Sequence, residues 1–236
     1  RSFIDQHITM SEPLYSTQQL RDHFDRENYD AVIVGSDQTW RPKYSPNIYN
    51  FYLDFLEDKE ILRIAYASSF GVDEWEYTEE QTKRCAELAK KFDAISVRED
   101  SGVELCRKYL GVEATHVLDP TLLLDKEDYL QLIGPERLKA KPEGVCTYFL
   151  DKSPKKSKYA LRISESLGSF AYCCQARYAI DPYMTCNIND FIMPNIMDWL
   201  SGFLNSKFVV TDSFHGCVFS IIFNIPFVAI ENDKRG

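Results

Sequence analysis

Short apolar runs that end at a polar turn recur along this chain, and each is followed by a helical pattern. The sharpest case lies at residues 208–220, where Phe-Val-Val-Thr leads into Asp212, Ser213 and His215. Apolar residues then recur at helical spacing at Phe214, Cys217, Val218 and Ile221. This pattern predicts a buried strand that feeds a helix. Its repetition limits the chain to α/β folds, in which helices connect parallel strands.

The remaining elements follow from the same reasoning. Further strands are expected at residues 31–34, 61–67, 94–97, 115–118, 145–150, 169–174 and 226–230. Helices are expected at residues 78–92, from 101 onward, and at 125–137, 155–167 and 194–205. Thr78 with Gln81, and Ser101 with Glu104, have the spacing of N-terminal helix caps. Residues 1–28 are polar and mixed and show no clear period.

A polar stretch with two turn residues, Lys139–Gly144, is the expected boundary between two domains. The strand and helix pattern restarts after it. We therefore predict two Rossmann-like lobes with mostly parallel sheets, an N-terminal α/β lobe at 1–140 and a C-terminal α/β lobe at 141–236. The chain starts with Arg1 and ends on a loop-like tail, so we expect a fragment that is incomplete at both ends.

Composition excludes several classes of protein. A net charge of -9 argues against nucleic acid as a partner, because phosphate neutralisation needs a basic face. The longest apolar stretch, Phe219–Ile230, is interrupted by Asn224 and Pro226, so no integral membrane segment is predicted. Seven scattered cysteines without a C-x-x-C pair favour reduced thiols and no metal site. We predict a cytoplasmic location, which is compatible with activity near the inner face of the membrane.

Four polar corners stand at the carboxyl ends of predicted strands: Gly35–Trp40, Ser68–Gly71, Arg98–Asp100 and Asp212–Gly216. Ligands of open α/β sheets bind at this edge, where helix N-termini offer free N–H groups to anions. A histidine at such a corner can transfer a proton to a bound anion. His215 is therefore the best candidate for chemistry.

These corners, taken in order, resemble the polysaccharide pyruvyl transferase family. The matching segments are residues 29–40, 67–71, 96–99, 119–121 and 211–216. The resemblance extends from about residue 29 to residue 232. It implies a two-lobed fold similar to the GT-B glycosyltransferases. It also implies transfer of pyruvate from phosphoenolpyruvate, as donor substrate and without a further cofactor, to a sugar of a cell-surface or secreted polysaccharide such as an exopolysaccharide.

The resemblance also implies roles for individual residues. Family members use an arginine at the position of Arg98 to hold the donor and a histidine at the position of His215 as general acid. We expect Asp212 to orient His215 or to cap its helix. The remaining predicted donor-binding residues are Ser69, Ser213 and Gly216. The predicted acceptor or cleft residues are Ser36, Asp37, Gln38 and Trp40.

The chain departs from the family in two respects. Better-known members carry arginine at the position of Ser213, and serine cannot replace a bidentate phosphate contact. Another cation, such as Arg177 or Arg235, would have to compensate, or the donor differs, or the branch has another activity. The family's first βαβ segment is also not present before Arg1.

Structural readings remain open beside the functional ones. His215 can cap its helix, Arg98 can form a surface ion pair with its acidic neighbours, and Trp40 can be a packing residue. Asp119, before Pro120, suits an Asx-type turn. The basic run at 152–158 is typical of a solvated helix face, with binding of an anionic substrate as the weaker alternative.

Two other functions remain open from the sequence. One is a nucleotide-sugar glycosyltransferase of similar fold, in which helix N-termini would hold a diphosphate. The other is a non-catalytic carbohydrate or anion-binding protein. The transferase hypothesis requires that the side chains of Arg98 and His215 point into one cleft between the lobes.

Overall fold

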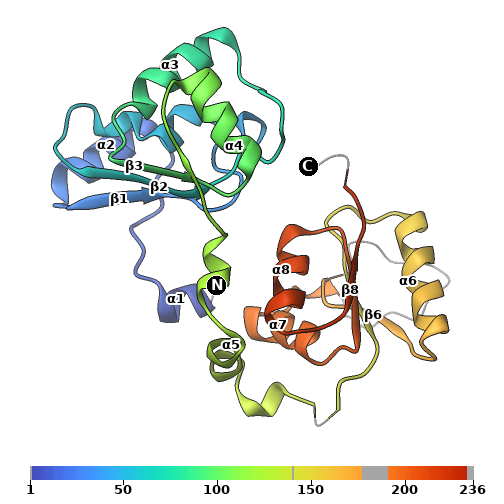
Figure 1. The fold of residues 1–236 in the computed structure, drawn as a ribbon. Coiled ribbons are helices and arrows are strands. Elements are labelled where there is room, and N and C mark those ends of the chain that lie inside the picture. Colours follow the sequence, from blue (N-terminus) through green and yellow to red (C-terminus); the bar gives the residue numbers. More distant parts are fainter. Residues whose placement is uncertain (1, 140, 177–190, 233–236) are drawn as a thin grey trace. The chain divides into compact units, whose positions relative to one another are not determined.

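The computed structural model describes residues 2–139, 141–176 and 191–232 (Figure 1). The chain divides into two compact units. We name residues 10–120 the N unit, and the described residues of 1–9 and 121–234 the C unit. This division assigns residues 121–139 to the C unit, whereas the boundary predicted from the sequence lies at 140; the domain limits stay a prediction. Each unit contains a four-stranded parallel sheet with helices, which confirms the predicted α/β class.

The strands of the N unit follow the order of the chain. They are β1 (Ala31–Val34), β2 (Leu62–Ser68), β3 (Ala94–Val97) and β4 (Thr115–His116), arranged β1-β2-β3-β4. The helices are α2 (Thr17–Arg26), three 3₁₀ turns at 42–44, 48–52 and 54–56, α3 (Glu79–Ala89), and α4 (Asp100–Leu105), which continues as a π-helical segment to Leu110. Right-handed crossovers in a sheet of this order all fall on one face. In Figure 1, α3 and α4 lie over the same side of the sheet.

Burial in the N unit follows from this one-sided winding. Ile95 and Val97 point into a core that the connections cover. On the opposite face Ile33 is 64% exposed and Leu62 52% exposed. The register pairs Ile33 with Ile64, which places their side chains on the same face. This sheet therefore has one covered face and one open face.

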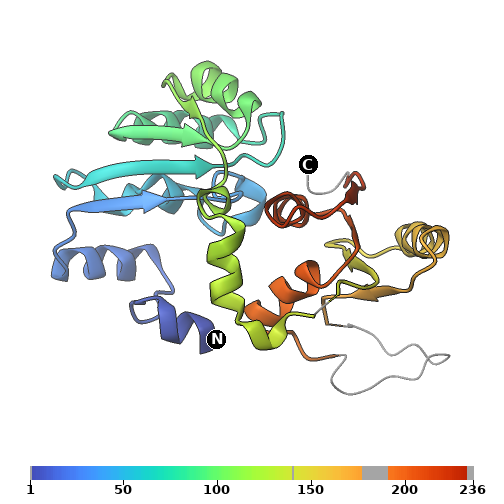
Figure 2. The same ribbon diagram turned by 60° about the horizontal axis from the view of Figure 1, so that its bottom comes forward.

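The sheet of the C unit reverses direction. Its strands are β5 (Val145–Tyr148), β6 (Ala171–Cys173), β7 (Phe208–Thr211) and β8 (Phe227–Ala229), in the order β6-β5-β7-β8. Its helices are α1 (Ser2–His7), α5 (Lys126–Ile133), α6 (Pro154–Ser166), α7 (Ile196–Leu204) and α8 (Phe214–Ile222). Because the chain turns one way after β5 and the other way after β6, α6 covers one face and α7 and α8 cover the other (Figures 1 and 2). The sheet accordingly packs a hydrophobic cluster on each face.

Most predicted elements form within a few residues of their expected limits, and three differences are informative. Residues 1–28 contain two helices that the absence of a period concealed. A cap signal was present for α2, since the Ser16 side chain accepts a hydrogen bond from the backbone N–H of Gln19 at 3.2 Å. The predicted strand at 115–118 has only two residues paired. The predicted cap at Ser101 is wrong, because α4 already begins at Asp100.

Candidate active site

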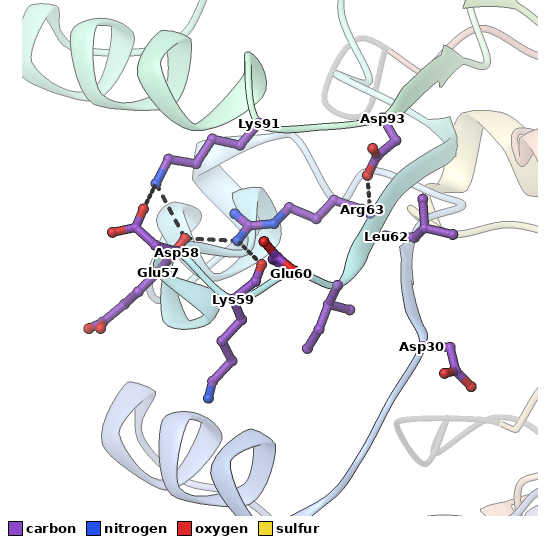
Figure 3. Close-up of a pocket in the computed structure, with 10 residues that line it drawn as sticks. Asp30, Glu57, Asp58, Lys59, Glu60, Leu62, Arg63, Lys91 and Asp93 are labelled. Atoms are coloured by element: carbon purple, nitrogen blue, oxygen red, sulfur yellow. Dashed lines mark hydrogen bonds and ion pairs between the residues drawn. The ribbon is translucent and has the colours of Figure 1, made fainter.

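A well-defined hollow of the N unit lies at the amino ends of the strands, away from the predicted corners. This cavity, of about 560 Å³, is lined by residues 30, 57–63, 91 and 93. In Figure 3 the Arg63 and Lys91 side chains reach toward the loop at 57–59. Arg63 donates to the carbonyl oxygens of Glu57 and Lys59, at 2.8 and 3.3 Å. These contacts hold a loop together, and ligands of parallel sheets bind at the opposite edge.

At that opposite, carboxyl edge, Arg98 is the centre of a charged cluster. Its side chain is only 5% exposed. The guanidinium donates through Nη1 to Asp119 at 3.1 Å and to Asp37 at 3.4 Å, and through Nε to Glu99 at 3.2 Å. Asp119 is fully buried, whereas 68% of the Asp37 side chain is exposed. We name Asp37, Ser69, Arg98, Glu99 and Asp119 the N corner; its formal charge is negative because three carboxylates surround one guanidinium.

Side-chain and backbone contacts of Ser69 hold the loops of the N corner together. Ser69 donates its hydroxyl to Glu99 Oε1 at 2.5 Å, and its backbone N–H to the Asp37 carbonyl oxygen at 3.0 Å. The other oxygen of Glu99, Oε2, is buried and has no hydrogen-bond partner among the described residues. Gly35 has φ +126°, and a Cβ there would stand 2.1 Å from the Tyr66 carbonyl oxygen. Only glycine therefore allows the β1 loop to approach β2 this closely.

Of the site residues predicted in the N unit, some lie close together in the structure, and one, Trp40, is buried in the core. Asp37, Ser69 and Arg98 form the N corner, and the half-buried Gln38 accepts from Arg41 nearby at 3.1 Å. Ser36 is half-buried on the same turn. Trp40 is fully buried.

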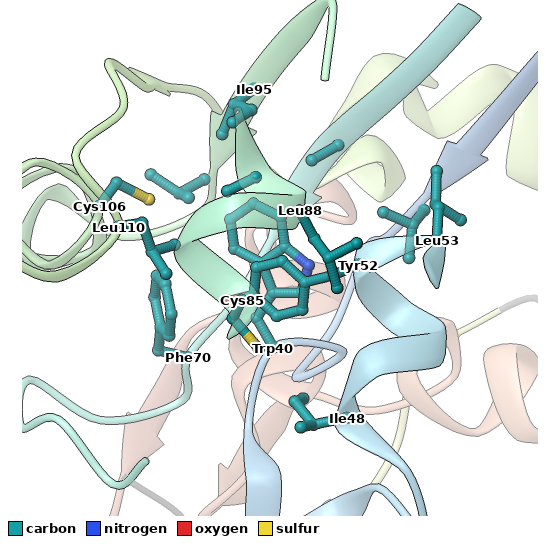
Figure 4. Packing of buried hydrophobic residues seen from close by; sticks show 14 of the residues in the cluster. Trp40, Ile48, Tyr52, Leu53, Phe70, Cys85, Leu88, Ile95, Cys106 and Leu110 are labelled. Atoms are coloured by element: carbon teal, nitrogen blue, oxygen red, sulfur yellow. The ribbon is translucent and has the colours of Figure 1, made fainter. Parts of the chain in front are cut away.

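The surroundings of Trp40 are those of a packing residue. Its ring stacks on Tyr52, with centroids 4.8 Å apart and planes 10° apart. Its indole N–H donates to the Phe51 carbonyl oxygen at 3.0 Å. Figure 4 shows Trp40 among the core residues of α3 and the neighbouring loops. In this structure the ring offers no free face to a sugar.

In the C unit the predicted strand-to-helix corner forms as expected. β7 ends at Thr211 and α8 begins at Phe214, with Ser213 as N-cap. The Ser213 hydroxyl accepts from the backbone N–H of Gly216 at 3.4 Å. A Cβ on Gly216 would stand 2.2 Å from Thr211 Oγ1, so the helix can pack on the strand only with glycine there. Both predicted donor-binding residues of this turn, Ser213 and Gly216, are buried and shape the corner.

Asp212 connects this corner to two other segments. Its side chain is fully buried. It accepts hydrogen bonds from the backbone N–H groups of Leu150 and Asp151, at 2.6 and 3.2 Å. Lys156 Nζ donates to it at 2.5 Å and Asn232 Nδ2 at 3.1 Å. We name Asp212, Lys156, Asn232 and the turn at 211–216 the C corner.

The C corner lies where the winding of the sheet reverses. β5 and β7 are neighbours, yet α6 follows β5 on one face and α8 follows β7 on the other. Such a topological switch point is the usual ligand site of a doubly wound sheet. Helices α6 and α8 both begin at this edge, and the N-terminus of a helix carries a partial positive charge. The arrangement suits an anionic ligand.

His215 is half-buried in the first turn of α8. Its ring meets that of Phe214 nearly edge-on, at 5.3 Å between centroids. Among the described residues, His215 is not a hydrogen-bond partner of Asp212, whose acceptor oxygens serve the four groups named above. Arg177 and Arg235, the cations proposed from the sequence, lie outside the described residues. Arg98 and His215 belong to different units, so their meeting in a common gap stays a prediction.

The sequence placed Lys156 only within a solvated basic run and Glu99 only as an ion-pair neighbour of Arg98, and it gave Asn232 no role. A signal existed for Lys156, because a lysine in the first turn of a helix opposes the helix dipole and calls for a negative partner. No comparable signal marks Asn232. Cys217 is half-buried in α8, and burial raises the pKa of its thiol, which makes it a poor nucleophile.

Comparison with known proteins agrees with this geometry. Two parallel sheets with helices and polar corners at their carboxyl edges define the class as an α/β protein with two Rossmann-like units. The family model of polysaccharide pyruvyl transferase matches residues 3–234, nearly the whole chain. The chain therefore belongs to the polysaccharide pyruvyl transferase family and is a transferase. None of the curated proteins compared with the sequence matches it. No helix in the described part of the chain is long and apolar enough to cross a membrane.

Proposed function

We propose that the protein transfers pyruvate from phosphoenolpyruvate to a pair of sugar hydroxyls and forms a ketal, with His215 as the general acid. The observation that carries this proposal is the position of His215 in the first turn of α8, at the switch point of the C-unit sheet. Family membership supplies the reaction class and the carbohydrate acceptor. Histidine titrates near neutral pH unaided, which suits a group that must give and recover a proton.

The proposed reaction balances without a redox partner. The imidazolium of His215 gives its proton to the methylene carbon of the donor, which becomes a methyl group and leaves an oxocarbenium-like centre. One sugar hydroxyl attacks that carbon and releases its proton. The carbon–oxygen bond to phosphate then breaks, and the second hydroxyl closes the ketal and releases its own proton. One proton returns to His215 and the other leaves with inorganic phosphate.

The two corners offer different groups to the substrates. The N-termini of α6 and α8 suit the anionic donor. At the N corner the oxygens of Asp37 and Glu99 are acceptors that suit sugar hydroxyl groups, which are donors. We assign Arg98 to the donor as well, where an anion would replace Asp37, the most exposed and most distant of the three carboxylates of the N corner.

The direct test is transfer itself. Purified protein, phosphoenolpyruvate and acceptor glycans should yield a pyruvate ketal by mass spectrometry, with one phosphate released for each ketal. His215→Gln should lower turnover by about 10²- to 10⁴-fold, the range of general acid catalysis. His7→Gln, an exposed histidine of the same unit, is the matched control. Near-normal turnover by His215→Gln would remove the assignment.

A binding assay tests the donor separately. Phosphoenolpyruvate, but not a nucleotide sugar, should raise the melting temperature, because a ligand that binds only the native state stabilises it. The reverse result would favour a nucleotide-sugar glycosyltransferase. Stabilisation without any change in the glycan would favour a binding protein.

Asp37→Asn tests the role of Arg98. If the donor competes with Asp37 for the guanidinium, this substitution should lower the donor KM by up to about fivefold, the scale of an exposed ion pair. If Asp37 instead holds the acceptor, the acceptor KM should rise and the donor KM should not change. A substitution that moves neither constant would exclude both roles.

We also infer that the protein acts in a reducing, cytoplasmic compartment. All six cysteines in the described ranges are free thiols, and four of them are buried. Proteins of oxidising compartments tend to pair their cysteines. Localisation of a tagged protein by cell fractionation tests this inference, and recovery outside the cytoplasmic fraction would contradict it.

A further inference from the structure

Lys156 is a largely buried cation at the C corner, in a unit that carries Ser213 where better-known family members carry arginine. Its side chain is 14% exposed, and its ammonium group donates to the fully buried Asp212 carboxylate at 2.5 Å. The neighbouring Lys155 is exposed and lies 5.9 Å from the Tyr159 ring. Lys156 thus differs from the solvated basic face that contains it.

The position of Lys156 within α6 is electrostatically unfavourable by itself. It is the third residue of the helix after the N-cap Ser153, and no acidic residue stands in that first turn. The N-terminus of a helix repels positive charge. The Asp212 carboxylate supplies the opposite charge from the end of β7, 56 residues away in sequence. The pair therefore neutralises two charges that would each be costly at this place alone.

Asp212 uses this pairing to join three chain segments. It anchors the loop after β5 through Leu150 and Asp151, and the segment after β8 through Asn232. Its own backbone N–H donates to the Tyr148 carbonyl oxygen at 3.4 Å. The next residues form the cap and the first turn of α8. Whatever fixes Asp212 therefore fixes the backbone that carries His215.

We propose that Lys156 is a positioning residue: it holds Asp212 in place and so sets the position of His215 at the start of α8. The catalytic part of this proposal rests on the proposed function, whereas the positional part does not. Lys156 acts through Asp212 and does not contact the donor. Its loss should lower kcat and leave the donor KM unchanged.

A spectroscopic experiment tests the positional part without any substrate. In protein labelled with ¹⁵N-histidine, the ring signals of four histidines are expected, and His215→Gln identifies the signal of His215. Lys156→Gln should shift the His215 signal and leave those of His7 and His23 in place. Lys155→Gln, which removes the same charge one residue away, should shift none of them. An unmoved His215 signal in Lys156→Gln would overturn the proposal.

A thermodynamic cycle tests the pairing. Lys156→Gln should lower the melting temperature by roughly 5–10 °C, the scale expected when one partner of a buried pair is removed. In the Asp212→Asn background the same substitution should have a much smaller effect. Equal effects in both backgrounds would show that the two residues are not coupled, and the proposal would fail.

Kinetics complete the test at a temperature where every variant is folded. Lys156→Gln should lower kcat by about 10- to 100-fold, as expected for a misplaced catalytic group. The donor KM should stay within about twofold, and Lys156→Arg should recover part of kcat because it restores the charge. A rise in the donor KM at constant kcat would overturn positioning in favour of direct donor contact. If the wild type transfers no pyruvate, the spectroscopic and thermal results still decide the positional part.

Discussion

The N unit and the C unit contain the same number of parallel strands, yet their sheets differ in how many faces are covered. In the N unit each strand is added beside the previous one, and the right-handed connections all fall on one side. In the C unit the order reverses after β6, and helices cover both sides. One face of the N-unit sheet therefore remains open at Ile33 and Leu62, whereas Val209 and Val210 of β7 are both fully buried. Strand order, rather than hydrophobicity, decides this difference.

The two corners differ in the same way. At the N corner one cation stands among three carboxylates, on a sheet without a reversal. At the C corner one buried carboxylate is surrounded by donors, at the place where the winding changes direction. The N corner therefore has a negative formal charge, whereas the C corner is built around one buried ion pair. Substitutions that respond differently in the two units test these conclusions.

The largest effects are expected at the glycines that let each corner close. Gly35→Ala and Gly216→Ala should each cost about 3 kcal/mol or more, because a Cβ would stand 2.1 and 2.2 Å from its neighbour. Gly168 also has a positive φ but has open space around it. Gly168→Ala should therefore cost only about 1 kcal/mol. Calorimetry measures all three. Because Gly216 has no positive φ, a loss in Gly216→Ala no larger than that in Gly168→Ala would show that close approach does not matter.

Opposite faces of one sheet provide a matched pair of isoleucines. Ile95→Ala removes a buried side chain from the N-unit core and should cost about 2–4 kcal/mol. Ile33→Ala, on the open face, should change stability by less than about 0.5 kcal/mol. Urea denaturation compares them.

The C unit should lack this asymmetry. The side chains of Val209 and Val210 point to opposite faces of β7. Val209→Ala and Val210→Ala should each lower the free energy of unfolding by about 2 kcal/mol. A neutral Val210→Ala would mean that α6 does not cover its face. A costly Ile33→Ala would mean that the open face of the N unit is covered in solution.

The cap of α8 should give a smaller effect. Ser213→Ala should cost about 1 kcal/mol, because the Gly216 N–H loses its side-chain partner. Ser157→Ala, an exposed serine of α6, is the control and should cost almost nothing. Ser213→Arg, which introduces the residue common in the family, should be more destabilising than Ser213→Ala, because the position is only 4% exposed. Equal stability of the arginine variant would show that the corner opens easily.

The rate at which cysteines are alkylated should differ between the two units, and this test requires no substitution. Burial raises the pKa of Cys85 and of Cys106 to about 12, so at about pH 9 both N-unit thiols are almost entirely protonated. They should resist alkylation in the folded protein, since the thiolate is the reactive form. Cys173 of the C unit is exposed and should react before Cys85 and Cys106. Peptide mapping after brief iodoacetamide treatment measures this, and early labelling of Cys85 would show that the N-unit core opens.

Local sequence patterns predicted a large part of this structure. The capping box at Thr78 and Gln81 forms as expected. The strand-to-helix turn at 208–222 also forms, because its apolar period and polar corner are properties of neighbouring residues. Ser101 shows the limit of such patterns, since it had the right spacing for a cap. The helix begins at Asp100 with Glu99 as its N-cap residue, and the Glu99 side chain bonds to Arg98 and Ser69.

The sequence predicted where the turns of the candidate site lie in the fold, but it predicted only some of their side-chain contacts. The sequence correctly located the corners at carboxyl ends of strands and singled out Asp37, Ser69 and Arg98, which meet in the N corner. It did not indicate that Asp212 would bind Lys156, and it left open whether Trp40 packs in the core or lines the cleft. Each of these outcomes depends on which segments become neighbours.

The sequence by itself determined the α/β class, the strand-to-helix corners and the family, because those depend on periodicity and on motifs of adjacent residues. Only the tertiary structure decided which charges meet. Arg98 and Asp37 are 61 residues apart, and Lys156 and Asp212 are 56 apart. The order of strands in each sheet brings such residues together, and that order is a property of the packed chain, in which burial and crossover handedness select one arrangement among several.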